Sequence, residues 1–253
     1  MNNIITIFKK ELIGYIQSPM AYVVAAAFFT VTGFFFVASV SDAFSEASIR
    51  GFLAGAVFFL VFLSPALTMR LLAEEQKLGT IELLMTSPIK EFEIVLGKYL
   101  ASFTIMCLML AGTLYYPIVL FIFGIPDLGP IFTGYLGLIL YSATTLSVGI
   151  FASSLSSNQL LSLVVGSGIL TLLTFIDFMS SRLPGFAGTI LQQFQLGGSF
   201  SIFDTSSFGL AESGHFADFA RGIISIYDIF FYISLSIIFI VSTILVLESR
   251  RWK

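Results

Sequence analysis

Apolar residues run along this chain in long stretches that contain no Asp, Glu, Lys or Arg. The charge-free stretches cover residues 12–41, 51–69, 99–126, 128–176 and 229–247. A helix that crosses the ~30 Å hydrocarbon core of a bilayer needs about 20 apolar residues. Each stretch is therefore long enough for a membrane-spanning helix, and the fourth is long enough for two.

The fourth stretch is interrupted by a cluster of serines, an asparagine and a glutamine at residues 153–159. Such polar residues favour a turn between two helices rather than a position in hydrocarbon. The pattern thus predicts an all-α, polytopic membrane protein with six transmembrane helices. We place them at about residues 20–40, 51–70, 98–123, 131–152, 159–177 and 226–247.

Two prolines fall inside predicted spans, Pro65 in the second and Pro117 in the third. Proline removes a backbone N–H and clashes with the preceding turn. Neighbouring helices can satisfy the freed carbonyl groups within a membrane. We therefore expect a kink at each proline.

The segment 1–18, which precedes the first span, is predicted to form an amphipathic interfacial helix on the inner side. Five large apolar residues recur there at helical spacing, and three charged residues fall elsewhere on the helical wheel. A cytoplasmic extension of the first span is the alternative. The apolar positions are Ile4, Ile5, Phe8, Leu12 and Tyr15, and the charged ones are Lys9, Lys10 and Glu11.

The inner segment 70–90, between the second and third spans, is predicted to contain short helices. Gly79 is expected to end one helical piece, and Thr80 to cap a second piece at about residues 81–86. Glu82 would lie near the positive end of that second piece. Its apolar side chains need a covering surface, either lipid headgroups or a partner protein: these are Ile81, Leu83, Leu84 and Met85.

The outer segment 178–225 is rich in Gly, Ser and Phe and is expected to form short interfacial or re-entrant helices. We interpret its polar residues as solvated loop groups, because they lack a metal-ligand spacing: Asp204, Glu212, His215 and Asp218. Two carboxylates near the outer ends of spans are interpreted as structural, with two arginines as available partners. These are Asp177 and Asp228, with Arg182 and Arg221.

Composition agrees with a membrane protein and excludes a soluble domain. The chain is 57% hydrophobic and 11% charged, whereas a soluble domain is about 25% charged. Lys and Arg near helix ends mark the cytoplasmic side. With six spans and both termini cytoplasmic, nine of the 12 basic residues lie inside, which favours this orientation in a bacterial plasma membrane. The inner ones are Lys9, Lys10, Arg70, Lys77, Lys90, Lys98, Arg250, Arg251 and Lys253, and the outer ones are Arg50, Arg182 and Arg221.

Catalytic motifs are missing from the sequence. It has no phosphate-binding loop of the Gly-x4-Gly-Lys-Ser/Thr type, so we expect no nucleotide hydrolysis by this chain. One histidine, His215, and one cysteine, Cys107, argue against a metal site or an internal disulfide. No basic footprint for nucleic acid is present, and no charge pair in mid-membrane favours an ion-coupled carrier. An enzyme is therefore not expected, nor a cofactor bound by this chain.

The inner segment carries a recognisable motif, Arg-x3-Glu-Glu-x3-Gly-Thr-x-Glu-Leu-Leu-x3-Pro, from Arg70 to Pro88. It resembles the inner loop of ABC-2 type permeases, the membrane subunits of one class of ABC transporters. Residues 8–12, 18–22, 95–98 and 247–252 are similar, more narrowly, to the permease group associated with gliding motility. The resemblance extends over nearly the whole chain, as a single transmembrane domain 1–253.

The resemblance implies a half-transporter that pairs with a second copy or a related permease, and that engages a separate cytoplasmic ATPase subunit carrying ATP and Mg. Segment 1–18 would be the interfacial helix, in contact with membrane lipid, and the coupling helices would lie within 70–90. Export of an unidentified substrate is the family expectation. A non-transporting scaffold that transmits force in an envelope or gliding-motility complex is the alternative, and an extracytoplasmic accessory protein stays open as a further partner. The expected ATPase-coupling residues are Glu74, Glu75, Gly79, Thr80, Glu82, Leu83, Leu84 and Pro88.

Overall fold

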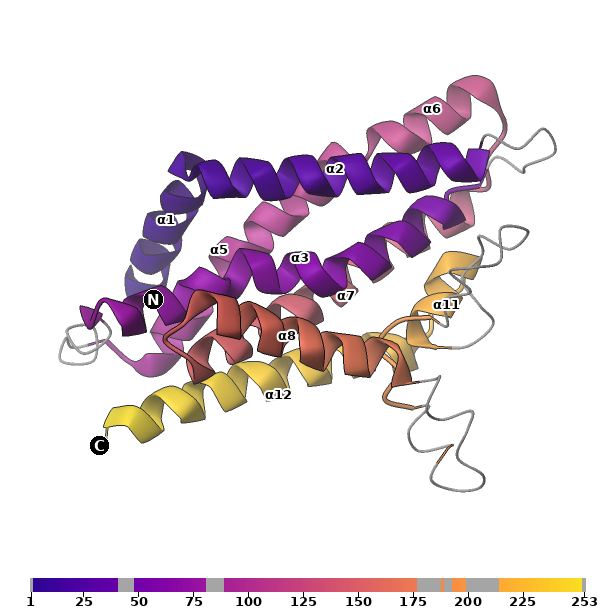
Figure 1. Ribbon diagram of the computed structural model, residues 1–253. Coiled ribbons are helices and arrows are strands. Elements are labelled where there is room, and N and C mark those ends of the chain that lie inside the picture. The colour runs from indigo at the N-terminus through magenta and orange to yellow at the C-terminus, as the bar shows by residue number, and fades with distance from the viewer. Residues whose placement is uncertain are drawn as a thin grey trace.

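A computed structural model of the chain describes residues 2–40, 48–80, 89–176, 188, 193–198 and 214–251. These described residues form nine α-helices and contain no strand, which confirms the all-α prediction (Figure 1). The helices are α1 (Asn2–Gln17), α2 (Pro19–Val40), α3 (Arg50–Lys77), α5 (Glu91–Gly112), α6 (Tyr115–Phe123), α7 (Leu128–Leu155), α8 (Gln159–Thr174), α11 (His215–Arg221) and α12 (Ile226–Arg251).

Five of the six predicted spans are confirmed as helices that are long and apolar enough to cross a membrane. They are α2, α3, the α5–α6 pair, α7 and α12. The fifth predicted span corresponds to α8, whose 16 residues extend over about 24 Å at 1.5 Å per residue. The predicted turn lies between α7 and α8, where the Asn158 side chain accepts a hydrogen bond from the Leu160 N–H and caps α8.

Both prolines lie within spans, as predicted, and the kink at Pro65 stays a prediction. Helix α3 continues through Pro65. The third span is interrupted at Thr113 and Leu114, between α5 and α6, in the turn that the Pro117 ring disrupts. Pro117 then lies in the first turn of α6, where a backbone N–H has no partner within the helix and its absence costs little.

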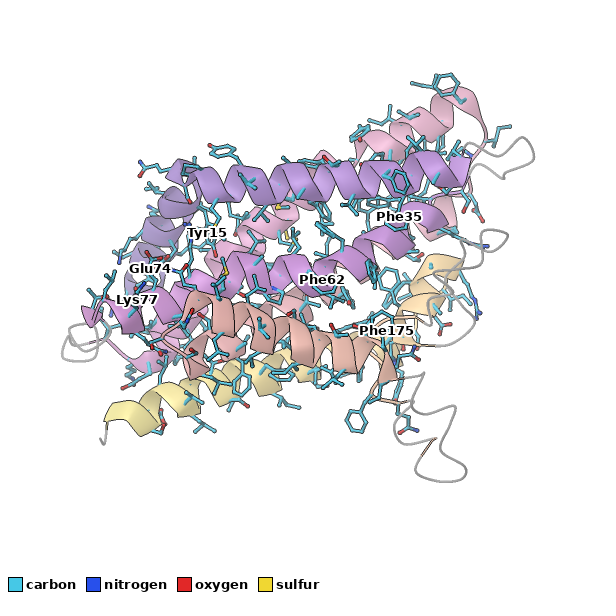
Figure 2. The ribbon with its side chains drawn as sticks, in the orientation of Figure 1. Tyr15, Phe35, Phe62, Glu74, Lys77 and Phe175 are labelled. Atoms are coloured by element: carbon cyan, nitrogen blue, oxygen red, sulfur yellow. The ribbon has the colours of Figure 1, made fainter. Side chains whose placement is uncertain are left out.

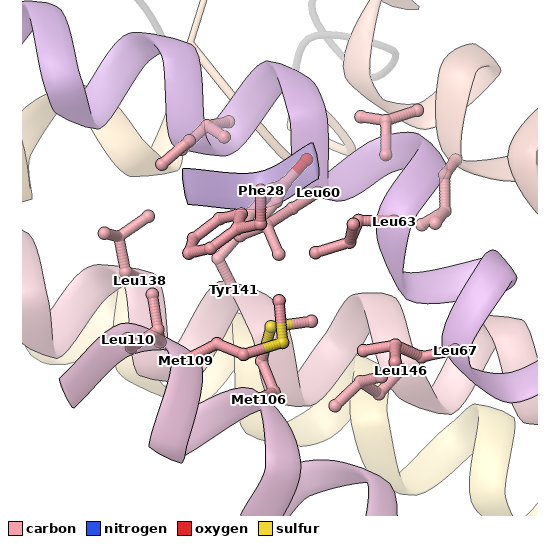
Figure 3. Packing of buried hydrophobic residues seen from close by; sticks show 14 of the residues in the cluster. Phe28, Leu60, Leu63, Leu67, Met106, Met109, Leu110, Leu138, Tyr141 and Leu146 are labelled. Atoms are coloured by element: carbon pink, nitrogen blue, oxygen red, sulfur yellow. The ribbon is translucent and has the colours of Figure 1, made fainter. Parts of the chain in front are cut away.

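Helices α3 and α7 form the centre of the bundle. In the apolar 18-residue segment of each of these two helices, 72% of the residues are buried, against 22% in α2 and 17% in α12. The outer helices leave large apolar side chains exposed, as expected for faces that contact lipid. Figure 3 shows the core between these helices, with Leu60, Leu63 and Leu67 of α3 near Met106 of α5 and Leu146 of α7.

Buried hydroxyl groups join the central helices to their neighbours. The hydroxyls of Ser64 in α3 and Thr145 in α7 lie 2.8 Å apart. Thr144 in α7 donates to the backbone carbonyl of Tyr232 in α12 at 3.0 Å. Small and hydroxyl-bearing residues let membrane helices approach closely and supply hydrogen bonds where water is absent.

The two ends of the bundle differ. Both ends of the chain lie at the same end of the bundle, together with α1, which runs at an angle to α2, and the C-terminal end of α3 (Figure 1). Helix α11 and the far end of α6 lie at the opposite end. Below, the end with both termini is called the inner end, and the opposite end the outer end.

Candidate functional site

Helix α3 ends where the sequence predicts a break. The Leu78 N–H donates to the Glu74 carbonyl at 3.0 Å, and the Gly79 N–H donates to the Gln76 carbonyl at 3.3 Å. Gly79 has a φ of 69°, a left-handed conformation that glycine adopts without steric cost and that commonly ends a helix. The Thr80 hydroxyl donates to the Glu75 carbonyl at 3.3 Å and so also satisfies the end of α3.

The last turn of α3 presents an exposed surface at the inner end. Glu74 and Lys77 are exposed, and Figure 2 labels both at this end of the molecule. The side chain of Leu78 is 66% exposed. The remaining predicted coupling residues lie outside the described residues: Glu82, Leu83, Leu84 and Pro88. Their part in coupling stays a prediction, and so does the capping of their helix by Thr80.

Glu75 points into the protein rather than outward. Its Oε1 lies 2.8 Å from the Nζ of Lys98 in α5, and the Oε1 of Glu11 in α1 lies 2.8 Å from the same Nζ. The Lys98 side chain is 1% exposed, whereas those of Glu11 and Glu75 are 19% and 17% exposed. A buried ammonium group needs charged, hydrogen-bonding partners to offset its lost hydration. We call these three residues the Lys98 cluster; it joins α1, α3 and α5.

A glycine brings α1 close enough to complete this cluster. A Cβ atom at Gly97 would lie 2.8 Å from the Ile7 Cγ2 of α1, so only glycine permits this approach. Glu11 follows Ile7 by one helical turn and lies on the same face, and Lys98 directly follows Gly97. The prediction that Glu11 lies away from the buried face of α1 was therefore wrong, because its ion pair with Lys98 turns that face inward.

A second contact fastens the corner between α1 and α2 to α3. The Arg70 Nη1 donates to the Ser18 hydroxyl at 2.8 Å, and the guanidinium carbon lies 4.8 Å from the centre of the Tyr15 ring. The Tyr15 hydroxyl donates to the Leu67 carbonyl at 2.7 Å. Burial raises the pKa of the Tyr15 phenol far above its ordinary value, so the hydroxyl keeps the proton that it donates.

Helix α7 contacts the same part of α3 from the other side. The Ser153 hydroxyl accepts hydrogen bonds from the N–H groups of Leu72 and Ala73, each at 3.1 Å, and donates to the Met69 carbonyl at 2.9 Å. One turn further, the Gln76 side-chain amide donates to the Ser154 carbonyl at 3.0 Å. A side chain inserted among the backbone groups of a helix is a recognised cause of bending.

The family model of the ABC-2 type transporter matches residues 2–182, which is well over half of the 253 residues. The chain belongs to the ABC-2 type transporter family. It is thus a multi-pass membrane protein and a permease component of an ABC transporter. No curated protein matches it. The narrower resemblance to the gliding-motility group stays a prediction.

The family match includes the inner segment 70–90 and every residue of the Lys98 cluster. Within this ABC-2 permease, the sequence predicted the helix end at Gly79, and the coupling role of Glu74, Glu75, Gly79 and Thr80 stays a prediction. Sequence reasoning missed Glu11, Lys98 and Ser153. Lys98 was counted only as a positive charge near a span. The adjacent Gly97 was the available signal, since a glycine before a lysine at a helix interface permits a close, ion-paired contact.

The outer end of the permease corrects two further expectations. His215 is 8% exposed rather than solvated, and its Nδ1 lies 2.6 Å from the Oδ1 of Asp228. Asp228 thus pairs with a histidine, whereas Arg221 lies 4.0 Å from Asp218. The His215 Nε2 lies 3.1 Å from the Gln193 carbonyl oxygen, and its ring stacks on Phe231. The imidazole is buried because these partners replace water.

Other polar residues at the outer end are partly accounted for. Asp218 is 41% exposed, as the interpretation of solvated loop groups requires. Asp177, Arg182, Asp204 and Glu212 lie outside the described residues. Within the described parts of the chain, no three His, Cys, Asp or Glu side chains are grouped in a way that could hold a metal ion.

Proposed function

We propose that this permease couples ATP hydrolysis by a separate cytoplasmic ATPase subunit to the movement of a substrate across the membrane, with the inner segment 70–90 as the docking element. Family membership supports a partnership with an ATPase subunit. The observation that carries the proposal is the end of α3. That helix begins as a buried membrane span and ends in exposed Glu74, Lys77 and Leu78, a mixed polar and apolar edge suited to a protein partner.

The docking edge is mechanically continuous with the membrane domain. Glu74 and Lys77 lie on the same helix as Ser64 and Leu67, which are buried in the centre of the bundle. ATP-driven closure of the partner changes the permease only if the two permease states bind the partner differently. A displacement at the end of α3 would reach the core without an intervening loop. Docking at this end could therefore favour one arrangement of the membrane helices over another.

ATP and Mg would be bound by the ATPase subunit, since this sequence has no phosphate-binding loop. We propose that two permeases, identical or related, form the pathway in a bacterial plasma membrane, with both termini cytoplasmic. The location of both chain ends at the inner end of the bundle supports an even number of passes.

The test is whether an ATPase subunit accompanies the permease and depends on the exposed edge of α3. The tagged permease is purified from its native membrane in mild detergent, and the proteins that come with it are identified. We expect a soluble ATPase with wild type and a marked loss of it with Glu74→Lys, because the substitution reverses an exposed charge at the proposed contact.

Glu248→Lys is the matched control, since Glu248 is an exposed carboxylate near the end of α12. It should retain the ATPase at the wild-type level. A stable wild-type preparation that contains no ATPase would refute the proposed function. Equal loss in both variants would instead show a general charge effect and remove Glu74 from the contact.

A further inference from the structure

We propose that Lys98 is a positioning residue for energy coupling: it makes the interfacial helix α1 and the inner end of α3 move as one unit. This inference rests on the proposed function, because the movement in question is the one that the ATPase would drive. It assigns a role to two residues outside the predicted coupling segment, Lys98 and Glu11.

Backbone packing alone does not join these helices. Helix α1 packs closely along α5, whereas the direct packing of α3 against α5 and against α1 is sparse. Helix α7 packs against both α3 and α5, so the direct links from the inner end of α3 to α1 and α5 are side-chain bridges. Glu75 supplies one of them through Lys98, and Arg70 supplies another through Ser18 and Tyr15.

The position of Glu75 makes its bridge sensitive to docking. Glu75 directly follows the exposed Glu74, so a partner that displaces the last turn of α3 also displaces the Glu75 carboxylate. Because Lys98 is bonded to both carboxylates at 2.8 Å, the displacement pulls on Glu11 and hence on α1. Separation would leave a buried charge without its partner, so joint movement is favoured over separation.

Unequal charge in the cluster strengthens this argument. Two carboxylates share one ammonium group, and the second oxygen of Glu75, Oε2, is buried without a hydrogen-bond partner. Among the described residues, Lys98 is thus the one group bonded to the Glu75 carboxylate, and no second partner would hold that carboxylate if Lys98 were removed. Its removal would leave two neighbouring acidic groups that repel each other and separate α3 from α1.

The experiment measures the distance between spin labels at Ile13→Cys in α1 and Phe62→Cys in α3, away from the proposed docking edge, in a Cys107→Ser background. Both labelled positions are exposed. The purified permease–ATPase complex is examined without nucleotide and after trapping with ATP and vanadate. We expect one narrow distance peak that stays in place, while the distance from Ile13 to an exposed label at Leu245→Cys in α12 shifts.

Lys98→Met should broaden or split the peak between α1 and α3 in both nucleotide states, although the ATPase still co-purifies. Lys98→Arg, which keeps the positive charge, should restore a narrow peak. Lys9→Met removes an exposed lysine of α1, outside the proposed docking element, and should have no effect. A narrow, unchanged peak in Lys98→Met would overturn the proposal.

Neutralising the whole Lys98 cluster distinguishes a role in stability alone from a role in joining α1 to α3. The variant Lys98→Met/Glu11→Gln/Glu75→Gln removes the unpaired charges and should regain thermal stability, yet we expect its peak to stay broad. If that variant recovers the narrow peak, packing rather than ion pairing joins the helices and the inference fails. Failure of the proposed function is seen separately, as a wild-type preparation without ATPase, and the nucleotide-free peak widths then still decide the role of Lys98.

Discussion

Lys98 illustrates how much one buried charge depends on its surroundings. Its side chain is 1% exposed and bonded to two carboxylates from different helices. A lysine is rarely buried so completely without such partners. Its neighbours, Gly97 and Ile7, set the separation between α1 and α5 at which these bonds form.

At this scale we predict that Lys98→Met lowers the stability of the permease. Removing one partner of a buried ion pair costs about 3–5 kcal/mol, because the remaining charges are left without compensation. The measurement is the thermal unfolding midpoint of the purified protein in detergent, which should fall clearly below that of wild type.

Lys90→Met serves as the reference, since Lys90 is exposed, and substitutions at such surface positions usually change stability by less than about 0.5 kcal/mol. Equal midpoints for the two variants would show that the Lys98 cluster contributes no net stability.

At the scale of elements, the contact between α1 and α5 depends on the missing side chain at Gly97. A Cβ there would lie 2.8 Å from Ile7 Cγ2 and 3.2 Å from the Ile4 carbonyl oxygen. Backbone atoms of α1 cannot move aside without displacing the whole helix. The close packing of the interfacial helix thus depends on this one position.

We predict that Gly97→Leu separates α1 from α5 and breaks the ion pair between Glu11 and Lys98. Hydrogen exchange of α1 amides in the detergent-solubilised protein should rise, because a helix without tertiary contacts opens more often. Gly168→Leu is the control, since a Cβ at Gly168 in α8 would have no described atom of a neighbouring helix within 4 Å. Unchanged exchange in α1 of the Gly97 variant would contradict the proposed tight contact.

At the scale of the whole molecule, the order of helices sets the location of the two termini. Both chain ends lie at the inner end of the bundle, and the α6 end of the third span lies at the outer end (Figure 1). Ile125, just after α6, is 98% exposed.

We therefore predict opposite accessibility for single cysteines placed at these ends in a Cys107→Ser background. A membrane-impermeant maleimide should label Ile125→Cys in intact spheroplasts, because that residue would lie on the outer side in the proposed orientation. It should label Lys10→Cys and Glu248→Cys only after the membrane is opened. Labelling of Lys10→Cys and Glu248→Cys on different sides of the membrane would refute a topology with both termini inside.

Much of the architecture follows from the sequence alone. Spans can be found because hydrocarbon excludes charge over about 20 residues, and this local constraint located α2, α7 and α12 within a few residues. Gly79 was recognised as a helix end because a left-handed residue after a helix is a local property. The proposed coupling segment is predicted from its own motif, between Arg70 and Pro88.

The tertiary structure decided which charged groups meet. Glu11, Glu75 and Lys98 are separated by up to 87 positions along the chain, and His215 of α11 meets Asp228 of α12 across the turn between the two helices. Helical periodicity places a side chain on a face, but it does not say which helix that face contacts. Local sequence therefore determined the spans and the helix ends, whereas the packing of helices determined the ion pairs, because a buried charge is stabilised by whichever partner folding brings within about 3 Å.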